Sequence, residues 1–131
     1  MDVQVIIDNL PLYFQGLRVT ILLVVSSLAL GLCLALPIAL LATSKNRWVS
    51  IGPKAFIYFF RGTPLLVQMF MIYHGMGQFE AVHESFLWVI FKQAYACALL
   101  AFALNTAAYT AEILRGTIEQ TAFGEIEAAK A

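Results

Sequence analysis

The sequence predicts an all-α integral membrane protein with three transmembrane helices, at about residues 19–44, 57–79 and 89–111. Hydrophobic residues occupy 61% of the 131 positions and charged residues 12%, against roughly 45–50% and about 25% in soluble domains. The charged residues are also clustered, which leaves long stretches without any Asp, Glu, Lys or Arg. A helix needs about 20 mostly apolar residues to cross the hydrocarbon core of a bilayer.

The first predicted span is interpreted as a retained helix rather than a cleaved signal peptide. Asp2 and Asp8 stand where a signal peptide carries basic residues, and the apolar run exceeds the signal core of about 7–15 residues. The second span reaches sufficient length when the charge-free stretch from Gly62 is extended backwards through "AFIYFF". The third contains the alanine-rich stretch 93–111, which carries no charged residue. None of the three alternates with period 2, which argues against membrane strands.

The distribution of basic residues predicts the orientation. The connector 45–56 and the start of the second span hold four basic residues and no acidic one: Lys45, Arg47, Lys54 and Arg61. By the positive-inside rule this connector is a cytoplasmic loop. Alternation then makes residues 1–15 an extracytoplasmic segment and places residues 115–131 in the cytoplasm.

Motifs for covalent chemistry are absent from the sequence. It contains no GxxxxGK[ST], HExxH, GxSxG or CxxC pattern, so nothing predicts a phosphate, metal or acyl-transfer site. The eight basic residues balance the eight acidic ones, so net charge favours neither nucleic acid nor an acidic substrate. We therefore expect no catalytic residue, no metal site and no cofactor in this chain.

The segment "RGTPLLVQ" gathers polar residues at the inner end of the second span. Thr63 followed by Pro64 is typical of a helix start, with Thr63 as N-cap. Arg61 is suited to bind lipid phosphates or the carbonyls of another helix, and Gly62 lies between Arg61 and Thr63 in the sequence. Gln68 needs a hydrogen-bond partner, because an amide one turn into a bilayer is costly to bury alone.

The third span carries polar residues that a lipid-facing helix would not need. Asn105, Thr106 and Tyr109 lie on successive turns, and Glu112 follows them. Small and hydrogen-bonding residues favour close helix packing, although some of these side chains could instead line a solute path. For Glu112, both pairing with Arg61 or Arg115 and contact with a cationic substrate stay open.

The last stretch, "FGEIEAAKA", predicts a short helix that must dock on a partner. Acidic residues in its first turn suit the helix dipole, and Ala128 and Ala129 leave a side with little bulk. A helix this short is not stable alone in water. A frayed cytoplasmic tail is the alternative.

Two motifs together resemble the permease subunits of ATP-binding-cassette importers for polar amino acids, in the histidine and arginine branch. "FGEIEAAKA" is similar to the start of their EAA loop, and "RGTPLLVQMFMIYHGMGQF" with "LNTAAYTAEILRGTI" is similar to their spans. The resemblance covers residues 16–131. It implies a type I importer permease fold, truncated within the cytoplasmic EAA loop, with residues 115–131 as the start of a coupling loop.

The resemblance also implies the partners and the residues that meet them. A separate ATPase subunit would bind ATP and Mg²⁺, a second permease subunit would complete the pathway, and an extracytoplasmic binding protein would deliver a basic or polar amino acid such as arginine or histidine. The protein would lie in the bacterial inner membrane. Docking to the ATPase falls on Gly124, Glu125, Ile126, Glu127, Ala128, Ala129 and Lys130, and the permease signature on Arg61, Gly62, Thr63 and Pro64.

The sequence departs from the family pattern in two places and in length. Ala122 stands where many relatives have proline, and Glu119 where a basic residue is common. The motif breaks off after the alanines, so we expect an amino-terminal fragment with three of the usual five spans. The competing hypothesis is a small structural or regulatory three-helix membrane protein without transport activity.

Overall fold

A computed structural model describes residues 2–121 and 123–131, and all regular structure within them is helical. This confirms the predicted all-α class. The elements in chain order are α1 (Val3–Asp8), α2 (Leu10–Ala42), α3 (Arg47–Gly62), α4 (Leu65–Phe70), a π-turn (Met71–Gly75), a 3₁₀ turn (Met76–Gln78), α5 (Glu80–His83), α6 (Trp88–Phe91), α7 (Ala94–Gln120) and α8 (Phe123–Lys130).

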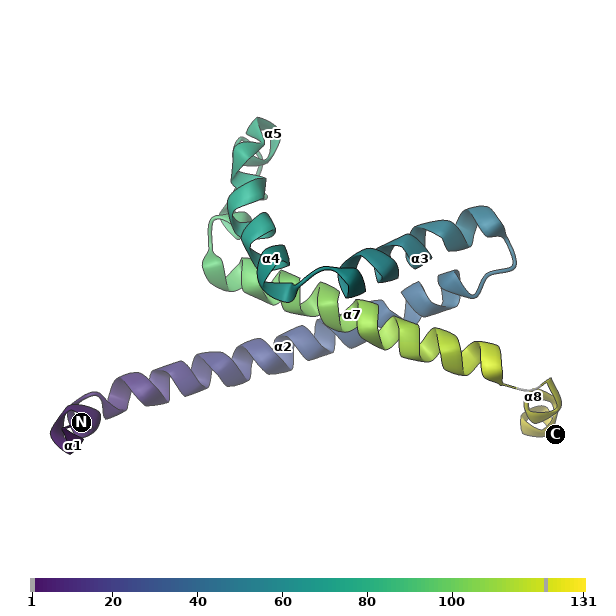
Figure 1. Ribbon diagram of the computed structural model, residues 1–131, viewed down its shortest axis with the longest axis horizontal. Coiled ribbons are helices and arrows are strands. Elements are labelled where there is room, and N and C mark those ends of the chain that lie inside the picture. Colours follow the sequence, from purple (N-terminus) through teal and green to yellow (C-terminus); the bar gives the residue numbers. More distant parts are fainter. Residues whose placement is uncertain (1, 122) are drawn as a thin grey trace.

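Two single helices, α2 and α7, are long and apolar enough to cross a membrane. A third candidate is the pair formed by α3 and the segment Leu65–Gln78, which is bent by 108°. The predicted count of three spans therefore holds if this bent pair is one span. In Figure 1, α2 and α7 cross one another, while α4 and α5 turn away from α3.

Helix α2 begins at Leu10, earlier than the predicted start near residue 19. Pro11 lies in its first turn, where a fixed φ and a missing N–H are tolerated. Arg18 marks the edge of the charge-free stretch, but one charge does not end a helix. With 33 residues and about 1.5 Å of rise per residue, α2 is roughly 50 Å long, longer than a hydrocarbon core of about 30 Å.

Helix α3 covers most of the range 45–56 that was predicted as a cytoplasmic loop. The irregular connection is confined to residues 43–46, and Asn46 is the N-cap of α3. The side-chain oxygen of Asn46 accepts a hydrogen bond of 3.1 Å from the backbone N–H of Trp48, a strong helix-start signal. Gly52 and Pro53 favour a loop in sequence, yet both are accommodated within α3.

The predicted span 57–79 is divided by a break at Thr63 and Pro64. Proline disfavours helical geometry in the residue before it, and Thr63 is extended, with ψ of 143°. Thr63 is therefore the C-cap of α3, and Pro64 is the N-cap of α4. The predicted N-cap role of Thr63 is wrong, because Pro64 takes that position and the Thr63 hydroxyl bonds back to the carbonyl oxygen of Phe59.

The third predicted span, 89–111, is also divided. Trp88–Phe91 forms α6, Gln93 is extended, and α7 then runs beyond Ala111 as far as Gln120. Its last turns carry ion pairs three and four residues apart, which stabilise helices at this spacing. The first residues of the predicted coupling loop, 115–120, therefore belong to α7.

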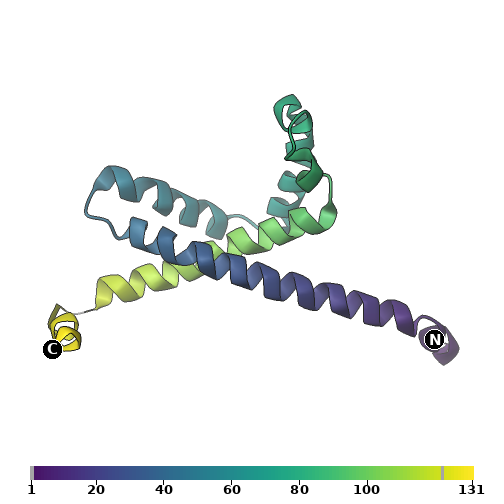
Figure 2. The same ribbon diagram turned by 180° about the vertical axis from the view of Figure 1, so that it is seen from behind.

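Small residues let α2 and α7 approach closely where they cross, and Figure 2 shows this crossing from behind. Ser27, Gly31 and Ala35 follow one another at four-residue intervals on α2, and all are buried. A β-carbon at Gly31 would lie 2.7 Å from Cβ of Thr106 and 3.0 Å from the carbonyl oxygen of Ala103 on α7. Only glycine fits this crossing point, and such small-residue contacts are typical of membrane helices.

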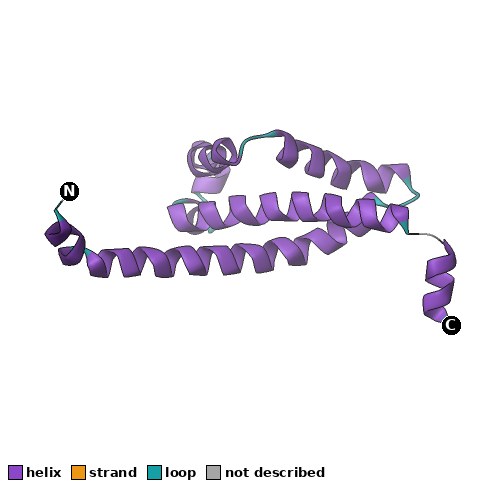
Figure 3. Ribbon diagram, turned by 60° about the horizontal axis from the view of Figure 1, so that its bottom comes forward, coloured by secondary structure: helices purple, strands orange, loops and turns teal. Residues whose placement is uncertain are grey.

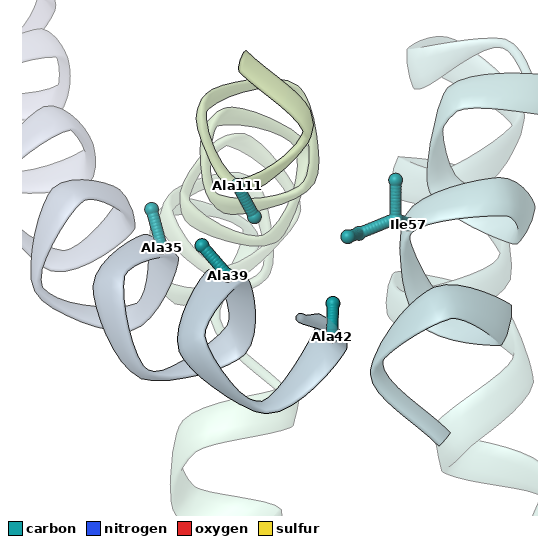
Figure 4. Packing of buried hydrophobic residues seen from close by; sticks show 5 residues of the cluster. All are labelled: Ala35, Ala39, Ala42, Ile57 and Ala111. Atoms are coloured by element: carbon teal, nitrogen blue, oxygen red, sulfur yellow. The ribbon is translucent and has the colours of Figure 1, made fainter. Parts of the chain in front are cut away.

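The same crossing continues into a small apolar core that includes α3. Figure 4 shows its members Ala35, Ala39, Ala42, Ile57 and Ala111. Ile57 of α3 is 3% exposed and packs against the alanine side chains of α2 and α7. This core positions the end of α3 beside α7.

Candidate functional site

The end of α3 contacts α7 through Arg61. Its guanidinium lies 3.6 Å from Oε1 of Glu112, measured from Nη1, and 5.6 Å from the ring centroid of Tyr109. Glu112 and Tyr109 are one turn apart on α7, so Arg61 meets a carboxylate and an aromatic ring on the same helix face. A cation in this position is attracted by both groups.

Glu112 is engaged by two arginines. Arg115 donates from Nε to Oε2 at 2.9 Å and from Nη2 to Oε1 at 2.6 Å. Arg115 also donates from Nη1 to Oε2 of Glu119 at 3.0 Å. Of the two roles left open for Glu112, the structure has the pairing with Arg61 and Arg115, and a cationic substrate would have to displace them.

A cavity of about 290 Å³ opens beside this ionic cluster. It is lined by Lys54, Ile57, Tyr58, Arg61, Glu112 and Arg115. The lining holds three cations and one carboxylate, so it is positively charged. A cationic amino acid would therefore be repelled from this cavity rather than attracted.

Gln68 joins the two helices of the α3–α4 break. Its Nε2 donates to the carbonyl oxygens of Phe60 at 2.9 Å and Thr63 at 3.1 Å, and to the hydroxyl of Thr63 at 2.6 Å. The side chain of Gln68 therefore binds carbonyls that the end of α3 leaves without helical partners. The predicted need of Gln68 for a partner is met, although its Oε1 is buried with no donor among the described residues.

The remaining polar residues of α7 lie in different surroundings. Thr106 packs against Gly31 at the α2 crossing and borders a cavity of about 330 Å³ between these helices. Asn105 is half-buried, and Tyr109 is 47% exposed beneath Arg61. The structure thus gives Thr106 and Tyr109 packing roles, and brings Tyr109 and Glu112, but not Asn105 or Thr106, into the Arg61 cluster.

Both histidines stack on aromatic rings. His74 lies with its ring centroid 5.7 Å from that of Phe70, and His83 lies 4.0 Å from Trp88. Among residues 2–121 and 123–131, no group of three His, Cys, Asp or Glu side chains could hold a metal ion.

The predicted docking residues form α8, which lies beyond the end of α7 and away from the other helices (Figure 3). Every described side chain from Gly124 to Ala131 is exposed. Glu125 lies in the first turn and Lys130 in the last, so both charges complement the helix dipole. Ala122, where the sequence departs from the family pattern, lies outside the described residues.

Comparison with known proteins shows the family of this chain. Residues 31–131 match the model of the family described as "Binding-protein-dependent transport system inner membrane component". The nopaline transport system permease protein of Agrobacterium fabrum is 48% identical over 100% of this chain and 55% of its own length. The histidine/lysine/arginine/ornithine transport system permease protein of Escherichia coli is 42% identical over 90% of this chain and 50% of its own length.

A solved structure has the same fold. The crystal structure of an amino acid ABC transporter with histidines matches with a TM-score of 0.81 and 32% identity, over 99% of this chain and 56% of the other chain. The chain spans about half the length of the curated relatives that it matches. On this evidence, the chain belongs to the family of binding-protein-dependent transport system inner membrane components.

Proposed function

We propose that this chain is part of the membrane-spanning permease subunit of an ATP-driven amino-acid importer. The observation that carries the proposal is the match in sequence and fold, over nearly the whole chain, to permeases and a transporter of amino acids. The competing hypothesis, a structural or regulatory three-helix membrane protein, has no similar support among these relatives.

The substrate that fits best is a basic or polar L-amino acid. Relatives carry names that refer to nopaline, octopine, arginine, and histidine with lysine, arginine and ornithine. The positive lining of the cavity at Arg61 disfavours that cavity as the binding site of a cationic substrate. We therefore leave this cavity out of the proposed path, keep the half-buried Asn105 of α7 as a candidate residue for the path, and give Glu112 a structural task.

Docking to the ATPase falls to α8. This helix is too short to be stable alone, it is exposed along its described side chains, and its small residues Gly124, Ala128 and Ala129 would allow a groove on a partner to approach the backbone. Glu125, Ile126, Glu127 and Lys130 would make the flanking contacts. The ATPase, rather than this chain, would bind ATP and Mg²⁺ and perform the catalysis.

The complete transporter would contain two permease subunits, like or unlike, and would receive its substrate from an extracytoplasmic solute-binding protein. In the inner membrane, the basic residues around α3 favour a cytoplasmic position for the α2–α3 connection. The amino-terminus would then lie outside and α8 inside.

The test is reconstitution of the full-length protein in proteoliposomes with its ATP-binding subunit, second permease subunit and solute-binding protein. We expect ATP-dependent uptake of radiolabelled arginine or histidine that stops when the ATP-binding subunit is omitted. Assembly of the complex without ATP-dependent uptake of any of a panel of polar and basic amino acids would contradict the proposal.

A further inference from the structure

The contact between Arg61 and α7 links two parts of the molecule that the proposed function treats separately. One part is the α3–α4 break, where the chain changes direction by 108°. The other is α7, whose end lies just before α8 in the chain. Any movement of α8 is delivered to α7 first, because Thr121 and residue 122 alone separate them.

The α3–α4 break is held together internally. Gln68 of α4 donates hydrogen bonds to Phe60 and Thr63 at the end of α3, and its side chain is buried. The hydroxyl of Thr63 donates in turn to the carbonyl oxygen of Phe59 at 2.9 Å. These bonds hold the end of α3 and the start of α4 together as one unit. We call residues 61–68 of this unit the 61–68 bracket.

The 61–68 bracket meets α7 through the ion pair of Arg61, beside the packing of α4 on α7. Ile57, one turn before Arg61, packs in the apolar core with Ala111. Arg61 extends this contact with its ion pair to Glu112 and its approach to Tyr109. Apolar side chains can slide past one another, whereas an ion pair combined with a cation–π contact fixes the register between the two helices.

We propose that Arg61 is a positioning residue for transport, and that its contact with Glu112 and Tyr109 transmits the movement of α7 to the α3–α4 bend. This inference rests on the proposed function, in which α8 docks on an ATPase. Loss of the contact would leave only the apolar packing of α4 on α7, which can slide, so ATP would be hydrolysed with less transport.

Arg115 supplies a matched control. It has the same charge as Arg61 and pairs with the same carboxylate, but its partners Glu112 and Glu119 both belong to α7. Removing Arg115 changes the charge of the cluster equally and leaves the link between helices in place. If the cluster acted only through its charge or its contribution to stability, removing Arg61 and removing Arg115 would have the same effect on transport.

The experiment compares Arg61→Gln, Glu112→Gln, the double variant and Arg115→Gln in the reconstituted full transporter. The readout is ATP hydrolysed per amino acid transported. We expect this ratio to rise at least about fivefold in Arg61→Gln, because about fivefold is the lower end of the typical coupling between two sites. Because both groups act through one contact, the double variant should be no worse than the worse single variant, and Arg115→Gln should stay near the wild type.

A second pair of variants covers failure of Arg61→Gln to assemble. Tyr109→Phe keeps the ring face and should couple normally, whereas Tyr109→Leu removes it and should raise the ratio. A wild-type ratio in Arg61→Gln, or equal ratios in Tyr109→Phe and Tyr109→Leu where Arg61→Gln does not assemble, would overturn the inference. An equal rise in Arg115→Gln would also overturn it. Absence of ATP-dependent uptake in the wild type would instead refute the proposed function.

Discussion

The amide nitrogen of Gln68 donates a hydrogen bond of 2.6 Å to the hydroxyl of Thr63, across the break between α3 and α4. The same nitrogen reaches the backbone carbonyls of Phe60 and Thr63. The two amide hydrogens of Gln68 thus serve three oxygen atoms that the break would otherwise leave without a hydrogen-bond donor. The bend is stabilised by a side chain, not only by proline geometry.

Gln68→Met should destabilise the protein. Methionine has a similar volume but donates no hydrogen bond, so the carbonyl oxygens at the end of α3 lose their donor. A carbonyl left without a donor costs up to about 1–3 kcal/mol, and removal of the buried, unpaired Oε1 of Gln68 offsets part of this cost. The midpoint of thermal unfolding of the purified transporter in detergent measures this change. Thr63→Ser, which keeps the hydroxyl, is the control, and an equal midpoint for the Gln68→Met variant and the wild type would contradict this role of Gln68.

Gly31→Ala should weaken the crossing of α2 and α7. The added β-carbon would lie 2.7 Å from Cβ of Thr106 and 3.0 Å from a backbone oxygen of α7. Since backbone cannot move aside easily, the helices must separate, and overpacking of this kind costs about 1–3 kcal/mol. Gly16→Ala is matched to it, because no atom lies within 4 Å of the added carbon there. Equal unfolding midpoints for the two variants would show that the crossing is looser than described.

These two sites show what the sequence could and could not predict. Hydropathy located α2 and α7, because the length of an apolar run is a local property. Pro64 predicts a kink or a helix start at this place, but apolar counts carry no information about its angle. The partners of Gln68 lie at the end of α3, in residues that the sequence assigns to the same span as Gln68.

The Arg61 cluster was partly predictable. Pairing of Glu112 with Arg61 or Arg115 followed from charge and span ends, and the structure has both contacts. The approach of Arg61 to Tyr109 depends on how α3 packs against α7, which no local pattern reveals. The sequence does not predict the early start of α3, because the connector 45–56 is assigned from its basic residues, although Asn46 is a good N-cap.

The proposed orientation predicts which cysteine variants react from outside. With Cys33 and Cys97 replaced by alanine, Asp8→Cys should react with a membrane-impermeant maleimide in intact spheroplasts. Lys45→Cys, in the connection between α2 and α3, should react only after permeabilisation. The opposite pattern would reverse the orientation inferred from the basic residues.

Glu127→Lys should uncouple uptake from ATP hydrolysis while leaving membrane insertion intact. Glu127 lies on exposed α8, and charge reversal would oppose docking on a complementary surface. Uptake by reconstituted transporter should fall at least about fivefold, as expected for loss of a typical coupling energy. Glu84→Lys, between α5 and α6 and on the side of the membrane opposite to α8 in the proposed orientation, should transport normally. Unchanged uptake in the Glu127→Lys variant would count against docking through this residue.

Docking of α8 on an ATPase subunit can be detected by site-specific cross-linking. A photoreactive maleimide attached to the Ala128→Cys variant, again without Cys33 and Cys97, is illuminated in the assembled transporter. We predict a covalent adduct between this chain and the ATP-binding subunit that changes in yield when ATP is added, and no such adduct from the Glu84→Cys variant. An assembled, transporting complex with no adduct from Ala128→Cys would contradict docking of α8 on the ATPase.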